Sequence, residues 1–305
     1  MNNYPLVSVY TCVYNGERTL HRVFDSMKKL DYPHIEHVIV NDGSTDRTDE
    51  LVQEYIRQVP FPVKYHKKEN GGKHSALNIV WDIAEGEFMI QLDADDKLLS
   101  HSIKFLVDTY YQIPEEIRSE YWCVHGRCVT QHGDFVGDKY PEGINCGSWR
   151  EAGEKARKCG GEKIGLQVRK YLCNYKFPEV MGVSYIPEAI VWTQINKVYG
   201  TWYTNEVVRI YYVGEGGNLT AKARSRKQFG PTCYWYKWNL MHPLENNKRL
   251  KTLLFYCLFY FITDKNYRKH NGYLTDLQQY RAVLVLLAPV AYIGAAIART
   301  IKKIR

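Results

Sequence analysis

Hydrophobic and polar positions over the first hundred residues fall into two alternating patterns. Short runs rich in β-branched and apolar residues are typical of buried strands, and they cover residues 6–13, 35–40, 63–66 and 88–92. Between these runs apolar residues recur at helical spacing, over residues 17–30, 51–59 and 76–83. Because the two patterns alternate, the sequence predicts an α/β fold with a Rossmann-like, doubly wound, mostly parallel sheet and right-handed crossovers.

The second half of the chain is less regular. Residues 121–129 and 202–213 have strand-like patterns. Residues 137–163 are rich in Gly, Lys and Glu and lack periodicity, which predicts a loop, an insertion or a disordered lid. A helix is expected from Lys97 to Tyr111.

Two apolar stretches lie near the C-terminus. Residues 253–262 are too few to cross a bilayer, whereas 282–298 are about 17 residues without a formal charge, the minimum for a span. Basic residues follow from Arg299 to Arg305, which favours an interfacial helix on anionic headgroups over a buried core helix. We therefore expect a catalytic domain over 1–230, with halves 1–115 and 116–230, and a helical, membrane-associating region over 231–305.

Polar residues follow each predicted strand of the first half. They are Tyr14-Asn15, Asn41-Asp42, Asn70-Gly71-Gly72-Lys73 and Asp93-Ala94-Asp95-Asp96. In doubly wound sheets the carboxyl ends of the strands form the ligand-binding edge, so we expect these four loops to lie together. Three closely spaced carboxylates suit a hard divalent cation that holds substrate phosphates. The alternative for the acidic stretch is a turn and a helix cap.

The absence of two common nucleotide-binding motifs narrows the class of ligand that this edge can bind. No G-x-G-x-x-G follows the first strand, and Gly71-Gly72-Lys73-His74 lacks the upstream glycine and the hydroxyl residue of a phosphate-binding P-loop. The sequence therefore combines an acidic metal site with a ligand-binding sheet edge that has neither the dinucleotide-binding motif nor the P-loop. This combination points to an enzyme that uses a nucleotide sugar.

Charge and cysteine content bear on partners and compartment. The net charge of +8 gathers beside apolar segments, which favours a membrane surface over nucleic acid. Eight cysteines without a C-x-x-C pair and a polar start favour the reducing cytoplasm. We therefore expect no nucleic-acid partner and a location in the cytoplasm, at the inner face of the cell membrane.

Four motifs in order resemble the inverting family 2 glycosyltransferases of GT-A fold. They are Val7-Ser8-Val9 with Tyr14-Asn15, Val38 to Asp46 with its Asn-Asp-Gly-Ser core, Asn70 to Lys73 with Ala76-Leu77-Asn78, and Ala84 to Glu87 with Leu92-Asp93-Ala94-Asp95-Asp96. The resemblance covers about a third of the chain. It implies inverting transfer of a sugar from a nucleotide diphosphate donor, usually UDP-linked, with Mn²⁺ or Mg²⁺.

The resemblance also implies roles for single residues. It assigns Tyr14 and Asp42 to the nucleotide base and ribose, with Cys12 and Asn15 beside them in the donor site. Lys73 would reach the nucleotide or the phosphates. Cys12-Val13 and Asn41 depart from the family pattern, where Pro-Thr and Asp are commoner.

Three carboxylates and one later glutamate complete the implied site. Asp93 would face the ribose or the metal, Asp95 with Asp96 would coordinate the metal, and Asp96 would also start the next helix. Glu188, before a predicted helix, is the candidate base for the acceptor hydroxyl, with Glu179 in reserve. Family members carry an acidic pair there, whereas this chain has Ala189. Ordinary helix-dipole chemistry is the alternative for Glu188.

A mobile lid is a further expectation from the sequence. A glycine-rich hinge from Gly214 leads to basic residues between Lys222 and Lys227, which could reach the phosphates. A surface hairpin with a solvated basic stretch is the alternative. Together the residues predict an inverting glycosyltransferase that acts on a glycan or lipid-linked acceptor in polysaccharide biosynthesis. The competing hypothesis, motivated by Ala189, is a non-catalytic glycan-assembly partner that keeps the fold.

Overall fold

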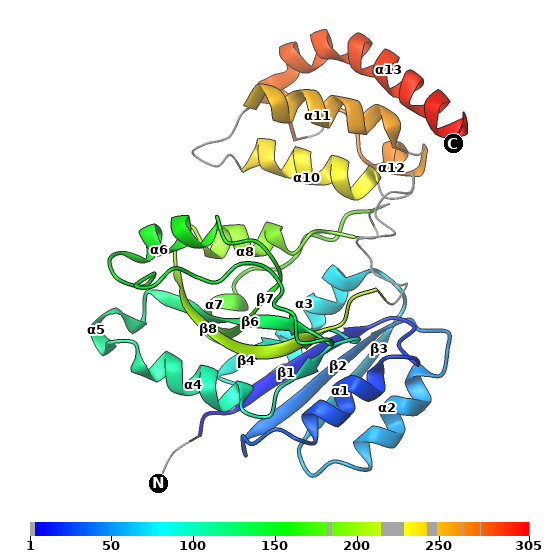
Figure 1. The fold of residues 1–305 in the computed structure, drawn as a ribbon. Helices are drawn as coiled ribbons and strands as arrows, with labels where there is room; N and C mark the ends of the chain where they lie inside the picture. The colour runs from blue at the N-terminus through cyan, green and yellow to red at the C-terminus, as the bar shows by residue number, and fades with distance from the viewer. Residues whose placement is uncertain are drawn as a thin grey trace. The chain divides into compact units, whose positions relative to one another are not determined.

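The computed structural model describes residues 4–181, 183, 185–214, 229–242, 249–263, 265–274 and 276–304. The chain forms two compact units (Figure 1). One unit contains Met1–Lys176 with Val191–Glu215, and the other contains Phe177–Ile190 with Gly216–Arg305. The predicted boundary at residue 230 stays a prediction, and the basic segment from Lys222 to Lys227 lies outside the described residues.

The first unit is built on an eight-stranded sheet with the order β3-β2-β1-β4-β7-β6-β8-β5. Its strands are β1 (Val7–Val13), β2 (Ile35–Asp42), β3 (Val63–Lys68), β4 (Phe88–Gln91), β5 (Lys97–Leu98), β6 (Tyr121–Thr130), β7 (Lys163–Val168) and β8 (Gly200–Tyr211). The first four strands pair in parallel, as predicted. Strand β7 runs antiparallel to β4 and β6, so the complete sheet is mixed.

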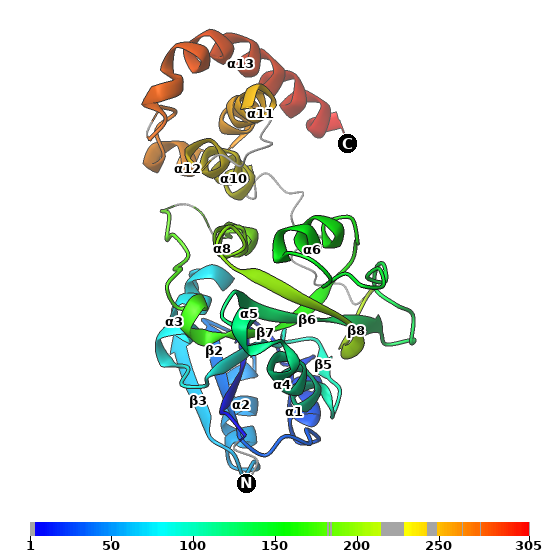
Figure 2. The ribbon, with the colours of Figure 1, turned by 90° about the vertical axis from the view of Figure 1, so that its left-hand side faces the viewer.

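Helices cover both faces of this sheet, as Figure 2 shows. One face carries α1 (Leu20–Met27), α2 (Thr48–Ile56) and α4 (Ser102–Gln112), and the other carries α3 (Lys73–Ile83), α6 (Trp149–Ala156) and α8 (Ala189–Ile195). Two short helices, α5 (Glu115–Arg118) and α7 (Arg169–Leu172), complete the unit. The arrangement confirms the predicted α/β class with helices on both sides of a sheet.

The core of the first unit is apolar and aromatic. β1 and β2 are buried on both faces, as expected for central parallel strands. On one side of the sheet Trp192 stacks between Trp81 and Trp122, with ring centroids 6.4 and 5.5 Å away. The indole N–H groups of Trp81 and Trp122 donate to Leu172 O and Asn196 Oδ1, so both rings are buried without losing their hydrogen bonds.

One prediction about local structure is wrong. The expected helix from Lys97 starts instead at Ser102, because Lys97 and Leu98 pair with β8 as the short strand β5. The stretch 137–163, predicted as a loop, an insertion or a disordered lid, is largely loop and also contains α6, whose first turn is closed by a capping box between Ser148 and Glu151. The capping-box sequence could have indicated this helix, although the surrounding segment is rich in glycine and lacks helical periodicity.

The second unit is helical. It contains α10 (Phe229–Met241), α11 (Arg249–Ile262), α12 (Lys265–His270), the 3₁₀ turn η2 (Gln278–Tyr280) and α13 (Arg281–Ile304). Helix α11 packs against both α10 and α13. Aromatic rings fill the space between these elements, for example Tyr236 with Phe255 at 5.3 Å and Tyr256 with Tyr273 at 5.8 Å. Part of the high tyrosine content is therefore core packing.

Candidate active site at the carboxyl edge of the sheet

The four polar loops predicted to share an edge do follow neighbouring strand ends. Strands β2, β1 and β4 are adjacent and parallel, so the loops after Asp42, Val13 and Gln91 leave the sheet on the same side. The loop after β4 is held to β1, because Leu92 N donates to Tyr10 O at 2.9 Å and Thr11 Oγ1 donates to Leu92 O at 2.8 Å. These two hydrogen bonds fix the position of the first residue of the acidic loop relative to β1.

Asn15 joins the loops after β1 and β2. Its backbone N–H donates to Ser44 Oγ at 2.9 Å, and its Oδ1 accepts from Thr45 N at 2.8 Å. Asn15 has a φ of 53°, in the left-handed region that asparagine tolerates better than most residues. Asn15 thus orders the loop that presents Tyr14, which is 53% exposed.

Asp42 organises the loop before α3. Its Oδ1 accepts from Gly71 N at 2.9 Å and from Lys68 Nζ at 2.7 Å, and its Oδ2 accepts from Gly72 N at 2.8 Å. Gly72 has a φ of 94°, which disfavours a side chain at that position. Asp42, assigned to the donor by resemblance, therefore also fixes the start of α3, and Lys73 with it.

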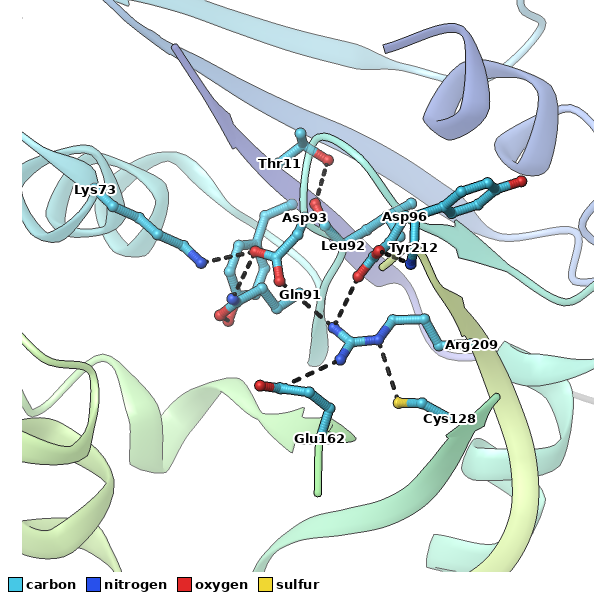
Figure 3. A network of polar contacts seen from close by, with 11 residues as sticks. Thr11, Lys73, Gln91, Leu92, Asp93, Asp96, Cys128, Glu162, Arg209 and Tyr212 are labelled. Carbon is cyan, nitrogen blue, oxygen red and sulfur yellow. Dashed lines mark hydrogen bonds and ion pairs between the residues drawn. The ribbon is translucent and has the colours of Figure 1, made fainter. Parts of the chain in front are cut away.

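Lys73 and Asp93 connect this loop to the acidic one (Figure 3). Lys73 Nζ donates to Asp93 Oδ1 at 2.7 Å, and Gln91 Nε2 donates to the same oxygen at 3.1 Å. Both residues of the ion pair are partly exposed, with 21% and 29% of their side chains accessible. The sequence predicted both residues as donor contacts, and the structure places them against each other.

Arg209 in β8 is the centre of a second network, drawn in Figure 3. Its guanidinium Nη1 lies 3.4 Å from Asp96 Oδ2 and 3.5 Å from Asp93 Oδ2. Its Nη2 lies 3.6 Å from Glu162 Oε2, and its Nε donates to Cys128 Sγ at 3.3 Å. Only 4% of the Arg209 side chain is exposed, so this cation compensates carboxylates in the interior.

Asp96 is fully buried by these contacts. Its Oδ1 accepts from Tyr212 N at 3.0 Å, and its exposed fraction is zero. Helix α4 begins later, with His101 at its N-cap, so the idea that Asp96 starts this helix is wrong. The burial of Asp96 against Arg209 favours a structural role, and its assignment as a metal ligand stays a prediction.

The three carboxylates differ in electrostatic environment. Burial alone would raise the pKa of Asp93, but the charges of Lys73 and Arg209 outweigh it and hold that pKa well below its usual range. Burial raises the pKa of Asp96 even though Arg209 opposes it. Burial and the neighbouring charge of Asp93 raise the pKa of Asp95. Asp95 differs from Asp93 and Asp96 in that no cation forms an ion pair with its carboxylate among the described residues.

The contacts of Asp95 support a metal ligand. Within the described residues, its carboxylate has no hydrogen-bond or ion-pair partner from another side chain, whereas its backbone oxygen accepts from Arg22 Nη1 at 3.3 Å. Among those same residues, no three acidic, histidine or cysteine side chains gather closely enough to hold a metal alone. Mg²⁺ and Mn²⁺ in nucleotide enzymes are often held by one or two carboxylates together with substrate phosphates. The residues present fit that arrangement.

Tyr212 extends the site beyond the acidic loop. The guanidinium carbon of Arg22 lies 3.9 Å from the centroid of the Tyr212 ring, and Lys97 Nζ lies 5.8 Å from it. These contacts link α1, β5 and the end of β8 around the loop that carries Asp95.

Cys12 and Glu188 have no contact with the acidic loop among the described interactions. Cys12 is half-buried in β1, opposite Val40 of β2. Glu188 directly precedes α8 and belongs to the second compact unit, and its role as the base stays a prediction.

Sequence reasoning missed Arg209, Glu162 and Cys128. Arg209 stands in the apolar run Val207-Val208-Arg209-Ile210, and a lone arginine in a central strand must meet a compensating charge. That signal was available, although the identity of its partners depends on the pairing of β8 with β6 and β5.

Comparison with known proteins finds relatives for this chain. Residues 8–117 match the model of Glycosyl transferase family 2. A Campylobacter jejuni enzyme, GalNAc(5)-diNAcBac-PP-undecaprenol beta-1,3-glucosyltransferase, is 26% identical over 92% of this chain and 84% of its own length. Hyaluronan synthase of Pasteurella multocida is 34% identical, over 36% of this chain and only 11% of that protein.

Two solved structures share the fold. Residues 1–349 of Staphylococcus aureus TarS, in complex with UDP-GlcNAc, superpose with a TM-score of 0.57 at 17% identity, covering 95% of this chain and 79% of that one. The mannosyltransferase PcManGT from Pyrobaculum calidifontis, with GDP-Man and Mn²⁺, gives 0.52 at 20% identity, covering 97% and 74%. Residues 8–117, just over a third of the chain, thus match the family 2 glycosyltransferases, and the chain shares a GT-A-like fold with these solved structures.

Proposed function

We propose that this glycosyltransferase moves a hexose from a UDP-sugar to a lipid-linked glycan, with inversion and with Mn²⁺ or Mg²⁺, in polysaccharide biosynthesis at the cytoplasmic membrane face. The observation that carries the donor and metal part is the open carboxylate of Asp95 beside the paired Asp93, at the edge where parallel strands present ligands. The lipid-linked acceptor is supported by the Campylobacter relative, whose name contains such an acceptor.

The chain's own residues would divide the work. Asp95 would hold the metal, which neutralises charge on the departing diphosphate when bound. Lys73 is fixed at the start of α3 and aimed at Asp93, so its ammonium lies where it can also meet a phosphate oxygen. Tyr14 offers an exposed ring to a nucleotide base. Glu188 would take the proton of the acceptor hydroxyl.

The test is donor turnover by the purified full chain. A panel of UDP-sugars is supplied with Mn²⁺ and a membrane lipid extract, and UDP release is measured. We expect Asp95→Asn to lower the metal-dependent rate by at least about 10²-fold. Asp25→Asn, on the exposed side of α1, is the matched control and should keep full activity.

The outcomes separate the alternatives. Full activity of Asp95→Asn would contradict the metal assignment. UDP-sugar binding without UDP release from any acceptor fraction would instead support the non-catalytic assembly partner. If Glu188 is the base, Glu188→Gln should lose roughly 10² to 10⁴ in turnover without weaker donor binding.

A further inference from the structure

Helix α13 is apolar on both its inner and its outer side. Its inner side is buried or half-buried within the second unit and consists of Leu284, Leu287, Ala288, Ala291, Gly294 and Ala295. This side meets α11: a Cβ on Gly294 would come within 3.4 Å of Leu258, and the Phe261 and Tyr292 rings are 5.8 Å apart. The helix is thus already packed along one face.

The outer side of α13 is a stripe of large exposed aliphatic residues. Leu286, Val290, Ile293 and Ile297 are 77%, 69%, 60% and 55% exposed. Their spacing of four, three and four residues places them on one face of a helix. Exposed apolar residues scattered singly are ordinary, but a continuous stripe of this length marks a surface that another apolar body covers.

The charges around this stripe are all of one sign. After Asp276 the chain contains no acidic residue, and its five basic residues flank the stripe at both ends: Arg281 before it, and Arg299, Lys302, Lys303 and Arg305 after it. Basic side chains at the ends of an apolar helix face pair with lipid phosphates and acidic headgroups. This one-sided charge matches the anionic surface of a lipid bilayer.

We propose that the outer face of α13 docks onto an anionic lipid bilayer, with the helix lying in the plane of the membrane. The proposal deepens the membrane location given in the proposed function, and it is independent of sugar transfer. Such a surface would bring the enzyme to acceptors whose lipid part is confined to the bilayer.

An in-plane position explains the packing better than a span. The apolar segment Gln278–Ile297 has 20 residues, which as a helix is about 30 Å and long enough to cross a bilayer. Crossing would, however, strip its inner face from α11, a helix of 14 residues that is too short to cross with it. Pro289 also lies midway along α13, which Figure 2 shows as a curved helix.

The experiment is co-sedimentation of the full chain with vesicles, without donor or acceptor. We expect binding to phosphatidylcholine–phosphatidylglycerol vesicles, weaker binding to pure phosphatidylcholine, and release from the vesicles by alkaline carbonate. The double variant Leu286→Gln and Ile293→Gln should lower the partition coefficient by about tenfold or more. Lys302→Gln with Lys303→Gln should lower binding to anionic vesicles by about fivefold per lysine.

The matched control replaces two equally exposed apolar residues outside α13. Met181→Gln with Val198→Gln, at positions 68% and 53% exposed, should bind vesicles as the unchanged protein does. Circular dichroism checks that all three double variants keep their helices. UDP release with a detergent-dispersed acceptor is measured separately. Loss of vesicle binding would therefore not contradict the proposed function, and loss of UDP release would not contradict the docking surface.

Three results would overturn the proposal. The first is unchanged vesicle binding by the variant with glutamines at 286 and 293. The second is extraction by detergent only, which would indicate a helix that crosses the bilayer. The third is absence of vesicle binding together with self-association that the same variant abolishes, which would make the stripe a protein interface.

Discussion

Removal of Arg209 is the sharpest test of how the acidic loop is held. Arg209→Met keeps most of the length of the side chain but removes the cation that lies 3.4 Å from Asp96 and 3.5 Å from Asp93. Breaking a buried ion pair by deleting one partner costs about 3–5 kcal/mol, because the remaining charge is left uncompensated in the interior. Against a total stability of about 5–15 kcal/mol, this variant should still fold.

Two comparisons identify the source of that cost. Arg127→Met removes another buried arginine, in the neighbouring strand β6, which donates to Gly137 O at 3.2 Å and lies over the Phe135 ring. Because Arg127 pairs with no carboxylate among the described residues, its loss should cost less, about 1–3 kcal/mol. In a double-mutant cycle with Asp96→Asn, the Arg209 and Asp96 changes should be coupled by about 1–3 kcal/mol.

The assay is urea unfolding followed by circular dichroism, with donor turnover measured on the same samples. We expect kcat/KM to fall by about 10²-fold in Arg209→Met, because Asp93 loses one of the two cations that fix its position. Additivity of the cycle within about 0.5 kcal/mol would refute the pairing. Unchanged turnover in a destabilised variant would refute the positioning role and leave only the structural one.

Three further predictions concern the sheet and its loops. Gly86→Ala should destabilise the first unit by about 1–3 kcal/mol in urea unfolding, because the new Cβ would lie 2.5 Å from Ser8 N. Gly153→Ala in α6 is the control: its new Cβ would meet no atom closer than 4.0 Å, so it should stabilise the protein by about 0.5–1 kcal/mol. Burial raises the pKa of Glu36, but the hydrogen bonds from Ser8 and the Glu85 N–H and the charge of Lys64 lower it by more. The pKa of Glu36 in the folded protein is therefore below its ordinary value. Its stabilisation is present above the unfolded-state pKa and is lost as the pH falls through the folded one, so Glu36→Gln should flatten the loss of stability on acidification. Asp42→Ala should raise the donor KM and the rate of proteolysis at residues 70–73, and unchanged values would contradict its role in holding Gly71 and Gly72.

Local periodicity was enough to predict the strands and helices of residues 6–92. Strands such as β2 and helices such as α1 carry their own apolar pattern, and parallel order follows from alternation. The antiparallel strand β7 and the two-residue strand β5 could not be predicted, because pairing between distant segments decides them. The same limit explains why the helix expected at Lys97 begins five residues later, at Ser102.

The site was predictable in its location and less so in its contacts. Strand ends placed Asp42, Lys73 and Asp93 at one edge, but the sequence does not tell which of them contact each other. Glu36 shows the opposite case: it is a buried carboxylate at the other end of the same strands, and it accepts from Ser8 Oγ at 2.5 Å and pairs with Lys64. A buried carboxylate is therefore not by itself evidence of a functional site. Its position at the carboxyl end of a strand is the feature that indicates one.

The three aspartates of the acidic loop illustrate this division within four residues. Asp96 is enclosed with Arg209, Asp93 is shared between Arg209 and Lys73, and Asp95 has a raised pKa and an open carboxylate. Replacing each by asparagine should therefore give three different signatures. Asp96→Asn should mainly change stability, Asp93→Asn should release Lys73 and weaken donor binding, and Asp95→Asn should change the metal requirement. Only if the three variants behaved alike would the loop have to be regarded as one undivided metal cluster.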